Sequence, residues 1–253
     1  MKWVKDFYSV SGHWWGPGGL VISDVERKRV EIVKRLGGTP GMKILELGAS
    51  YGETAAAFAE AGFDITGVEL SDRADYSEFW SKNDYKGKYK MIKDDFYQVS
   101  FDEKFDIVTY WNGFGIGIDE EQRKLLRKIS DKWLKEDGFA LIDIFNPITW
   151  ANWDGEDYDA TPKPEKGYKY HLKQHIEFDP ITSRFIDTWW EADKPAERHT
   201  QNIRCYSIPD FKLLLEGTGL KFVSVEAKGK QLEDIDHGTL MNDTHEYLVK
   251  LIK

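Results

Sequence analysis

The feature that most constrains the fold of this chain is an apolar run that ends in the glycine turn Gly48–Gly52. Residues 43–47 before the turn, with Ile44, Leu45 and Leu47, predict a strand, and residues 53–59 after it have the composition of a helix. Glycines let the backbone come close to a ligand, and a helix that starts just beyond them directs unpaired N–H groups at whatever binds. The pattern therefore predicts a site for the polar or charged end of a nucleotide-type cofactor.

A second part of the same pattern lies at Glu69. In nucleotide-binding units of this type, an acid about 20 residues after the glycines, at the end of the next strand, holds a ribose diol. Residues 65–70 read Ile-Thr-Gly-Val-Glu-Leu and place Glu69 at the end of such a strand. An ordinary strand, turn and helix also favours glycine in its turn, so the glycines alone are weak evidence. The acids at Glu46 and Glu69 favour the cofactor site over that plainer interpretation.

With Glu46 in the acidic place, the motif resembles that of the class I S-adenosylmethionine-dependent methyltransferases, which reads acid-x-Gly-x-Gly-x-Gly. The resemblance implies that the cofactor is S-adenosyl-L-methionine and that the product is S-adenosyl-L-homocysteine. It also implies that Gly48–Gly52 lines the methionine part of the cofactor and that Glu69 binds both ribose hydroxyls. The sequence departs from the family at the middle glycine, which is Ser50 here, and a serine is small enough to be tolerated.

The resemblance extends to two later strand ends. It implies that Asp95 receives the adenine amino group, that Phe96 covers the ring, and that the residues after the fourth strand lie at the transferred methyl group and the acceptor entrance. From the sequence alone, a turn with helix-capping duty is an equally good interpretation of Asp95. The full set of predicted cofactor residues is Glu46, Gly48, Ala49, Ser50, Gly52, Glu69, Leu70, Asp95, Phe96, Trp111 and Asn112.

The first 147 residues alternate between strand-like and helix-like patterns. Ser23 and Glu26 have the spacing of a capping box that opens a helix, and apolar residues at every fourth position predict another helix over 120–134. We also assign a helix to the polar segment between 70 and 90. Strands separated by helices imply parallel crossovers, with ligands at the carboxyl ends of the strands. The predicted strands in this part cover 43–47, 64–70, 89–93, 105–111 and 140–145.

After Pro147 the pattern changes. Residues 148–164 are rich in Trp, Asp, Gly and Pro and no longer alternate between strand and helix patterns. A helix is predicted to open at Ile208. The predicted strands in this part cover 168–178, 184–193, 198–207, 222–226 and 245–252. The predicted fold class is α/β, with a Rossmann-like seven-stranded methyltransferase sheet and an inserted antiparallel β cap. The sheet is mostly parallel and, by the family resemblance, antiparallel at its last strand.

The pattern also predicts how the chain is divided. The predicted parts are an amino-terminal lid segment 1–22, a methyltransferase domain 23–147 and 208–253, and a β-rich substrate cap 148–207. We hypothesise that the lid folds over the cofactor, with glycines on both sides of the Trp14–Trp15 pair as its hinge. A fixed aromatic cover over a sheet edge is the alternative.

The acceptor is expected to meet aromatic and polar side chains. Arg204 and Tyr206 project to the same side of a predicted strand, and pairing with a neighbouring carboxylate is as plausible as contact with the substrate. The predicted substrate residues are Tyr8, Trp14, Trp15, Trp150, Arg204 and Tyr206, and the candidate catalytic groups are His13 and Tyr206.

Composition narrows the function classes. The formal charge of −9 on 253 residues repels phosphate backbones, so long nucleic acids are disfavoured as partners. Cys205 is the only cysteine, which excludes an internal disulfide and predicts a cytoplasmic location. No apolar stretch has the length of a membrane span, and no metal is expected. We therefore expect a monomer or homodimer that methylates N or O of a small molecule. An RNA or protein methyltransferase and a non-catalytic S-adenosylmethionine-binding regulator are the alternatives.

Overall fold

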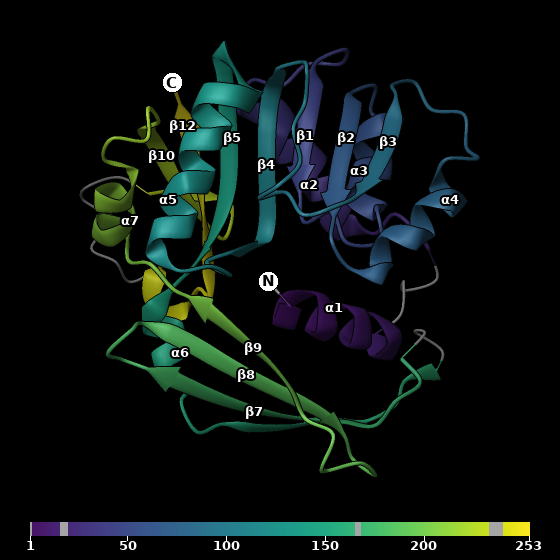
Figure 1. Ribbon diagram of the computed structural model, residues 1–253, viewed down its shortest axis with the longest axis vertical. Coiled ribbons are helices and arrows are strands. Elements are labelled where there is room, and N and C mark those ends of the chain that lie inside the picture. Colours follow the sequence, from purple (N-terminus) through teal and green to yellow (C-terminus); the bar gives the residue numbers. More distant parts are fainter. Residues whose placement is uncertain (1, 16–19, 165–167, 233–239) are drawn as a thin grey trace. The chain divides into compact units, whose positions relative to one another are not determined.

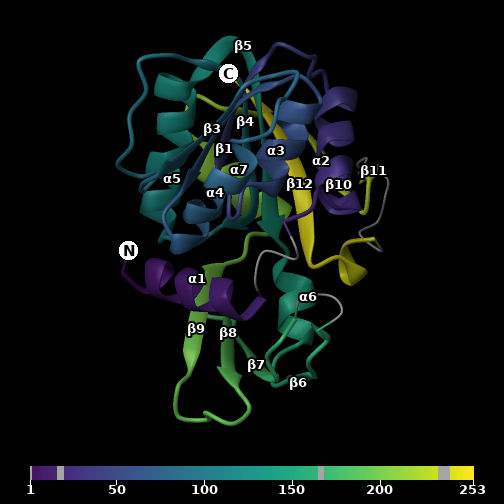
Figure 2. The ribbon, with the colours of Figure 1, turned by 90° about the vertical axis from the view of Figure 1, so that its right-hand side faces the viewer.

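The structure is a computed structural model that describes residues 2–15, 20–164, 168–232 and 240–253. Its residues fall into two compact units. The first unit contains residues 1–109, 133–138 and 163–169, and the second contains residues 110–132, 139–162 and 170–253. Figures 1 and 2 show the helices and strands that make up these units.

The strands form two sheets. The larger sheet has eight strands in the order β11-β10-β12-β5-β4-β1-β2-β3, and the smaller has four in the order β6-β7-β8-β9. This confirms the predicted α/β class with a mostly parallel sheet, an antiparallel edge and a separate antiparallel sheet. The larger sheet has one strand more than predicted, because the two-residue strand β11 (Lys230–Gln231) folds back on β10 (Lys221–Ala227).

The first unit contains the strand, turn and helix that the glycine motif predicted. The strands β1 (Lys43–Leu47), β2 (Asp64–Glu69) and β3 (Tyr89–Lys93) run parallel, and α3 (Glu53–Glu60) connects β1 to β2. Glu69 pairs with Lys93 in the register of β2 and β3. The carboxyl ends of these strands therefore meet at one edge of the sheet, where parallel sheets place their ligands.

Two helices in the first unit precede β1. The predicted capping box at Ser23 is present, and it opens α2 (Asp24–Arg35). The amino-terminal segment forms α1 (Lys2–Trp15), in which Phe7, Ser11 and Trp14 are buried. Residues 16–19, which include the glycines after Trp15 in the predicted hinge, lie outside the described residues.

The helix predicted between residues 70 and 90 is wrong for most of its length. Only η1 (Asp72–Tyr76) and α4 (Ser77–Trp80) are helical there. The following residues 81–88 form turns, because Asn, Asp and Gly hydrogen-bond locally or adopt turn conformations more readily than they extend a helix.

The middle of the chain confirms the predicted strands and helix but changes their bounds. The strand β4 (Phe105–Phe114) continues past Trp111, and β5 (Leu134–Phe145) begins earlier than predicted. The helix predicted over 120–134 is α5 (Asp119–Lys128) followed by the π-helical turn η2 (Ile129–Trp133).

The second unit contains the antiparallel side of the larger sheet. The last strand, β12 (Glu246–Ile252), runs antiparallel to both β5 and β10, as predicted. The helix α7 (Ile208–Leu215) starts at the N-cap Ser207, with a proline in its first turn. A proline is tolerated there because the first N–H groups of a helix have no intrahelical partner.

The smaller sheet also belongs to the second unit, between α6 and α7 in the chain. Its strands are β6 (Asp157–Ala160), β7 (Leu172–Asp179), β8 (Arg184–Glu191) and β9 (His199–Arg204). The predicted strand 168–178 begins only at Leu172, and Tyr168 before it is exposed. Within β7, Leu172 and Ile176 are buried while Glu177 is exposed, as in a half-buried strand. No helix or strand was predicted over 148–164, and β6 and most of α6 (Pro147–Asn152) lie in that range.

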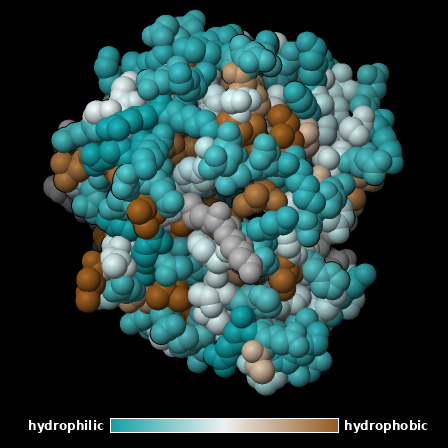
Figure 3. Space-filling view, in the orientation of Figure 1, coloured by the Kyte–Doolittle hydropathy of each residue, from teal (hydrophilic) through white to brown (hydrophobic). Residues whose placement is uncertain are grey.

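Hydrophilic side chains cover most of the face seen in Figure 3, with hydrophobic areas between them. The large exposed apolar residues, such as Val21, Ile118 and Ile181, are scattered along the chain. Scattered residues of this kind are normal on protein surfaces. Among the described residues, no helix is both long and apolar enough to cross a membrane.

Candidate active site

The loop between β1 and α3 has a tightly curled backbone. Gly48, Ser50 and Gly52 have φ angles of 65°, 51° and 89°, in the left-handed region. Gly52 is required there, because a Cβ atom would lie 2.4 Å from the Tyr89 Oη atom and non-glycine residues rarely adopt this φ. Gly52 is also the N-cap of α3 and supplies no side-chain bond to its first N–H groups. This start of α3 therefore fits the carboxylate of a methionine group.

Glu69 ties this loop to the next one. Its Oε2 atom accepts a hydrogen bond from the Ser50 N–H at 3.0 Å, and its Oε1 atom accepts from the N–H and the hydroxyl of Ser71 at 2.8 and 2.6 Å. A carboxylate has about four acceptor positions, so these three donors leave one at Oε2. The free position fits one ribose hydroxyl rather than the two predicted, and Glu69 has a second role in holding the two loops together.

Buried acids make this region suitable for a cation. The side chain of Glu46 is only 2% exposed, and its Oε2 atom has no hydrogen-bond partner among the described residues. Burial raises the pKa of Glu46 to about 8 and that of Glu53 to about 7. The raised pKa values favour the neutral acids, and a cation bound beside them would ionise both groups, so the positive sulfonium and ammonium groups of S-adenosylmethionine fit here.

The turn after β3 shows the plainer role of Asp95. Its Oδ1 atom accepts a hydrogen bond from the Tyr97 N–H at 2.8 Å, and its carbonyl accepts from the N–H groups of Gln98 and Val99. Phe96 is buried beside Tyr97, with the two ring centroids 4.8 Å apart. Asp95 therefore shapes a turn, and its contact with adenine, like that of Phe96, stays a prediction.

The residues Trp111 and Asn112 belong to the second unit. Trp111 is buried, whereas Asn112 is exposed and has a φ of 51°. Asparagine tolerates this left-handed conformation better than most residues. The bend is fastened by a hydrogen bond of 2.7 Å from the Tyr110 hydroxyl to the Gly113 carbonyl. The cofactor contacts predicted for this pair stay predictions.

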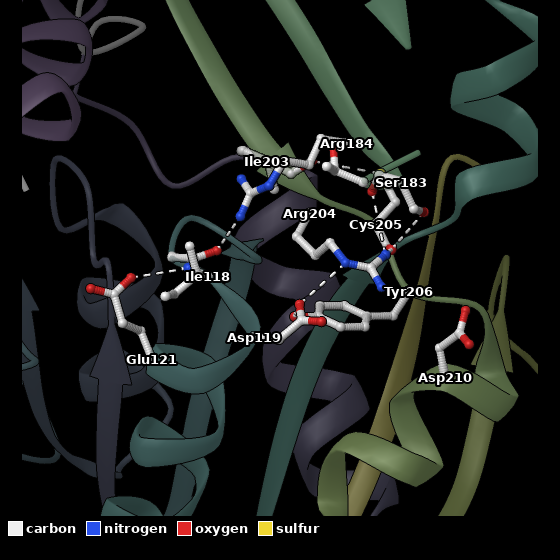
Figure 4. A network of polar contacts seen from close by, with 12 residues as sticks. Ile118, Asp119, Glu121, Ser183, Arg184, Ile203, Arg204, Cys205, Tyr206 and Asp210 are labelled. Atoms are coloured by element: carbon white, nitrogen blue, oxygen red, sulfur yellow. Dashed lines mark hydrogen bonds and ion pairs between the residues drawn. The ribbon is translucent and has the colours of Figure 1, made fainter. Parts of the chain in front are cut away.

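Arg204 and Tyr206 form the network shown in Figure 4, within the second unit. Asp119 accepts hydrogen bonds from the Tyr206 hydroxyl at 2.8 Å and from the Arg204 Nε atom at 3.2 Å. The Arg204 guanidinium lies over the Tyr206 ring, 4.5 Å from its centroid. The sequence had left pairing with a carboxylate open as an alternative, and this pairing is present. Contact of either residue with substrate stays a prediction.

The two candidate catalytic groups differ in exposure. The Tyr206 ring is buried, and burial followed by its bond to Asp119 raises the pKa of its hydroxyl far above the ordinary value. The phenol therefore keeps its proton and donates rather than accepts one. His13 is exposed on α1. The catalytic role of each stays a prediction.

The aromatic residues predicted to contact substrate have distinct surroundings. Trp14 is buried in α1, and Tyr8 and Trp15 are half-buried. Trp150 stacks on Phe185 with ring centroids 3.9 Å apart, and its indole N–H donates to the His245 carbonyl at 3.2 Å. These contacts pack α6 on the smaller sheet, so Trp150 has a structural role that the sequence did not indicate.

Sequence reasoning missed several polar residues at these sites. Ser71 and Arg73 directly follow Glu69 in the chain, and this proximity was the available signal. Asp187 is a buried acid on β8, and the only signal was its place in a strand-like run. Among the described residues, no three His, Cys, Asp or Glu side chains gather as a metal ion would require.

Comparison with known proteins gives the family. A family model described as a methyltransferase domain matches residues 21–225. The cypemycin N-terminal methyltransferase of a Streptomyces species is 27% identical over 122 residues, which cover 48% of this chain and 49% of that protein. The chain thus spans about half the length of this curated relative.

Solved structures share the fold. The CcbJ methyltransferase from Streptomyces caelestis has a TM-score of 0.71 and 15% identity, with 90% of this chain and 88% of that chain covered. An amino pentose methyltransferase from Micromonospora echinaspora, solved with S-adenosylmethionine bound, has a TM-score of 0.58 and 13% identity, with 90% of each chain covered. Since the family model matches most of its length, this chain belongs to the methyltransferase-domain family, which uses S-adenosylmethionine.

Proposed function

We propose that this protein transfers the methyl group of S-adenosylmethionine to a nitrogen or oxygen atom of a small-molecule acceptor. The observation that carries the proposal is the joined pair of loops, in which the carboxylate of Glu69 binds the Ser50 N–H and both donors of Ser71. The match of residues 21–225 to the methyltransferase domain supports it. The sugar and natural-product enzymes among the solved structures support the small-molecule acceptor.

The cofactor supplies a methyl group already activated by its sulfonium, so that the acceptor's lone pair bonds to carbon as the carbon–sulfur bond breaks and S-adenosylhomocysteine leaves. The protein's own task is then to bind, orient and exclude water. The uncapped start of α3 binds the methionine carboxylate, Glu46 and Glu53 ionise beside the positive groups, and Glu69 holds the ribose. The acceptor loses one proton, and His13 is the candidate base for a hydroxyl acceptor.

The remaining assignments belong to the same proposal. Residues 1–22 act as a lid, and residues 148–207 act as a cap that contributes Trp150, Arg204 and Tyr206 to the acceptor site. Asp95, Phe96, Trp111 and Asn112 complete the cofactor site. A cytoplasmic monomer or homodimer is the expected form.

Titration calorimetry with S-adenosylhomocysteine tests the cofactor site. We expect one molecule bound per chain, and we expect Glu69→Ala to raise the Kd at least tenfold, because it removes the ribose acceptor and releases both loops. Glu103→Ala is the matched control, since Glu103 is an exposed acid paired only with Lys43 among the described residues. Unchanged affinity for S-adenosylhomocysteine in Glu69→Ala would contradict the proposed cofactor site.

Transfer of a labelled methyl group tests the acceptor class. A panel of small amines, amino sugars and phenols is compared with total tRNA, rRNA and protein. Incorporation into a small molecule supports the proposal, whereas incorporation only into RNA or protein favours the alternative. Cofactor binding without transfer to any acceptor favours a regulator.

A further inference from the structure

The guanidinium of Arg73 joins the amino-terminal helix to the cofactor loop. Arg73 lies in η1, within four residues of Glu69. Its Nε atom donates to the Tyr8 carbonyl at 3.0 Å and its Nη2 atom donates to the Ser11 hydroxyl at 2.8 Å, both in α1. Its Nη1 atom donates to the Ser50 hydroxyl at 3.2 Å. One side chain therefore connects α1, η1 and the loop that follows β1.

Three aromatic rings surround the same guanidinium. Its central carbon lies 5.2 Å from the Tyr8 ring centroid, 5.7 Å from that of Trp15 and 5.1 Å from that of Tyr51. An arginine so placed over aromatic faces is attracted by their negative charge distribution. Arg73 makes no ion pair with a carboxylate among the described residues. The Arg73 guanidinium therefore interacts with aromatic rings, two hydroxyls and a carbonyl rather than with a carboxylate.

Two further hydrogen bonds connect α1 to residues beside Arg73 and Ser50. The Tyr51 hydroxyl donates to the Gly12 carbonyl at 2.8 Å, and the Asp72 N–H donates to the Ser9 hydroxyl at 3.2 Å. Gly12 lies where the side chain of Arg73 passes, and a Cβ atom there would be 2.9 Å from the Arg73 Cγ atom. Glycine is otherwise unfavourable inside a helix, and here it leaves room for the Arg73 side chain.

Ser50 is the residue that replaces the middle glycine of the family motif. A side chain at a φ of 51° is strained, so a compensating contact is expected. Its backbone N–H binds Glu69 and its hydroxyl accepts from Arg73. The serine therefore provides the attachment point through which α1 can influence the cofactor loop.

We propose that Arg73 is a positioning residue that fastens α1 to the two loops of the cofactor site through Ser50, Ser11 and Tyr8. Cofactor binding and the ordering of α1 are then coupled, because both depend on the same conformation of residues 48–52 and 71–73. This inference rests on the proposed function, since it takes an S-adenosyl compound as the ligand.

Calorimetry and amide hydrogen exchange test the coupling in the full-length protein, with S-adenosylhomocysteine as the probe. In the wild type, we expect the probe to slow exchange across residues 2–15. Arg73→Ala should raise the Kd about tenfold and abolish that slowing. Arg73→Lys should recover part of both, because it restores the charge and one donor. Arg27→Ala is the control, since Arg27 is exposed and paired with Glu60.

Two further variants separate the coupling from general destabilisation. Ser50→Gly should raise the Kd about threefold in the wild type and have no added effect in Arg73→Ala, because the two residues share one contact. Gly12→Ala should speed exchange in α1, although alanine is the better helix former. Asp6→Ala, at an exposed position of α1, should leave amide exchange in α1 unchanged.

The outcomes distinguish this inference from the proposed function. Absence of binding in the wild type overturns both. Binding with equal affinity and equal protection of α1 in wild type and Arg73→Ala overturns the role of Arg73 and leaves the cofactor site intact. Independent, additive effects of Ser50→Gly and Arg73→Ala overturn the link through Ser50.

Discussion

A buried carboxylate lies at the centre of a polar cluster in each unit, and the two are held by different donors. Glu69 in the first unit accepts two backbone N–H bonds, from Ser50 and Ser71, and one hydroxyl bond. Asp187 in the smaller sheet accepts from side chains alone, namely the amides of Gln174 and Gln201 and the indole of Trp189. The first depends on how a loop curls, and the second on which side chains three strands bring together.

The difference explains which site the sequence reveals. Backbone donors exist at nearly every residue, so a site built from them needs only a turn of the right shape, which short motifs encode. Side-chain donors on separate strands require a register, here the pairs of Gln174 with Trp189 and of Asp187 with Gln201. A register is set by the whole sheet rather than by a local motif.

The largest effect is expected at the glycine of the cofactor loop. Gly52→Ala places a Cβ atom 2.4 Å from the Tyr89 Oη atom and forces alanine into a left-handed conformation. The combined steric cost should lower the free energy of unfolding by about 4 kcal/mol and abolish binding of S-adenosylhomocysteine. Urea denaturation and calorimetry measure both. Gly155→Ala is the control, since Gly155 has a φ of 81° and open space around it. Equal losses in the two variants would contradict a specific role for the loop.

The next effect concerns the pH dependence of stability. The pKa of Glu46 is about 8 in the folded protein and near 4.5 when unfolded, so the folded state holds the proton more tightly. The free energy of unfolding therefore falls as pH rises from about 4.5 to about 8, by at most about 1.4 kcal/mol per pH unit for this one proton. Urea denaturation of wild type and Glu46→Gln between pH 5 and pH 9 should show a steeper fall in the wild type.

The exposed acid Glu60 gives the matched control, as Glu60→Gln should leave the slope unchanged. Burial also raises the pKa of Glu53, so its titration lowers stability over a similar pH range. Only the difference between wild type and Glu46→Gln therefore isolates the contribution of Glu46. Parallel curves for wild type and Glu46→Gln would show that the buried carboxyl does not hold its proton in the folded state.

The sequence predicted the parts of the fold whose signals are local. The capping box at Ser23 and the bounds of β1 and β3 follow from neighbouring residues, and the structure confirms them. The antiparallel last strand came from the family resemblance. The short strand β6 failed prediction because all four of its residues are exposed, so it has no buried face to give an alternating pattern.

The site residues show the same contrast between local and long-range signals. Glu69 was found because its distance from the glycines is fixed by one strand and one helix. Arg73 was missed because its partners Tyr8 and Ser11 lie 65 and 62 residues away in sequence. No spacing rule relates those positions, and only the packing of α1 brings them together.

A smaller loss of stability is expected at Asp187, and it tests the contrast between this carboxylate and Glu69. Asp187→Ala removes the acceptor for three side-chain donors, and we expect a loss of about 2 kcal/mol in the free energy of unfolding. The affinity for S-adenosylhomocysteine should not change, since the smaller sheet supplies none of the predicted cofactor residues. Asp187→Asn should recover part of the loss, because it keeps one acceptor oxygen. Asp193→Ala, at an exposed turn, is the control. Lost cofactor affinity in Asp187→Ala would remove the distinction between the two carboxylates.

The smallest effect is expected in the network around Asp119, where donors are again side chains but the acceptor is 57% exposed. The Arg204 side chain is only 16% exposed and also donates to the Ser183 and Cys205 carbonyls, so Arg204→Ala should cost about 1.5 kcal/mol of unfolding free energy. Tyr206→Phe should cost about 1 kcal/mol for one lost hydrogen bond. The raised pKa of Tyr206 keeps its phenol protonated, so Tyr206→Phe should leave kcat within about threefold of the wild type. A hundredfold fall in kcat with unchanged stability would instead show that the Tyr206 hydroxyl orients the acceptor through a hydrogen bond, and Asp119→Ala would then lower kcat as well.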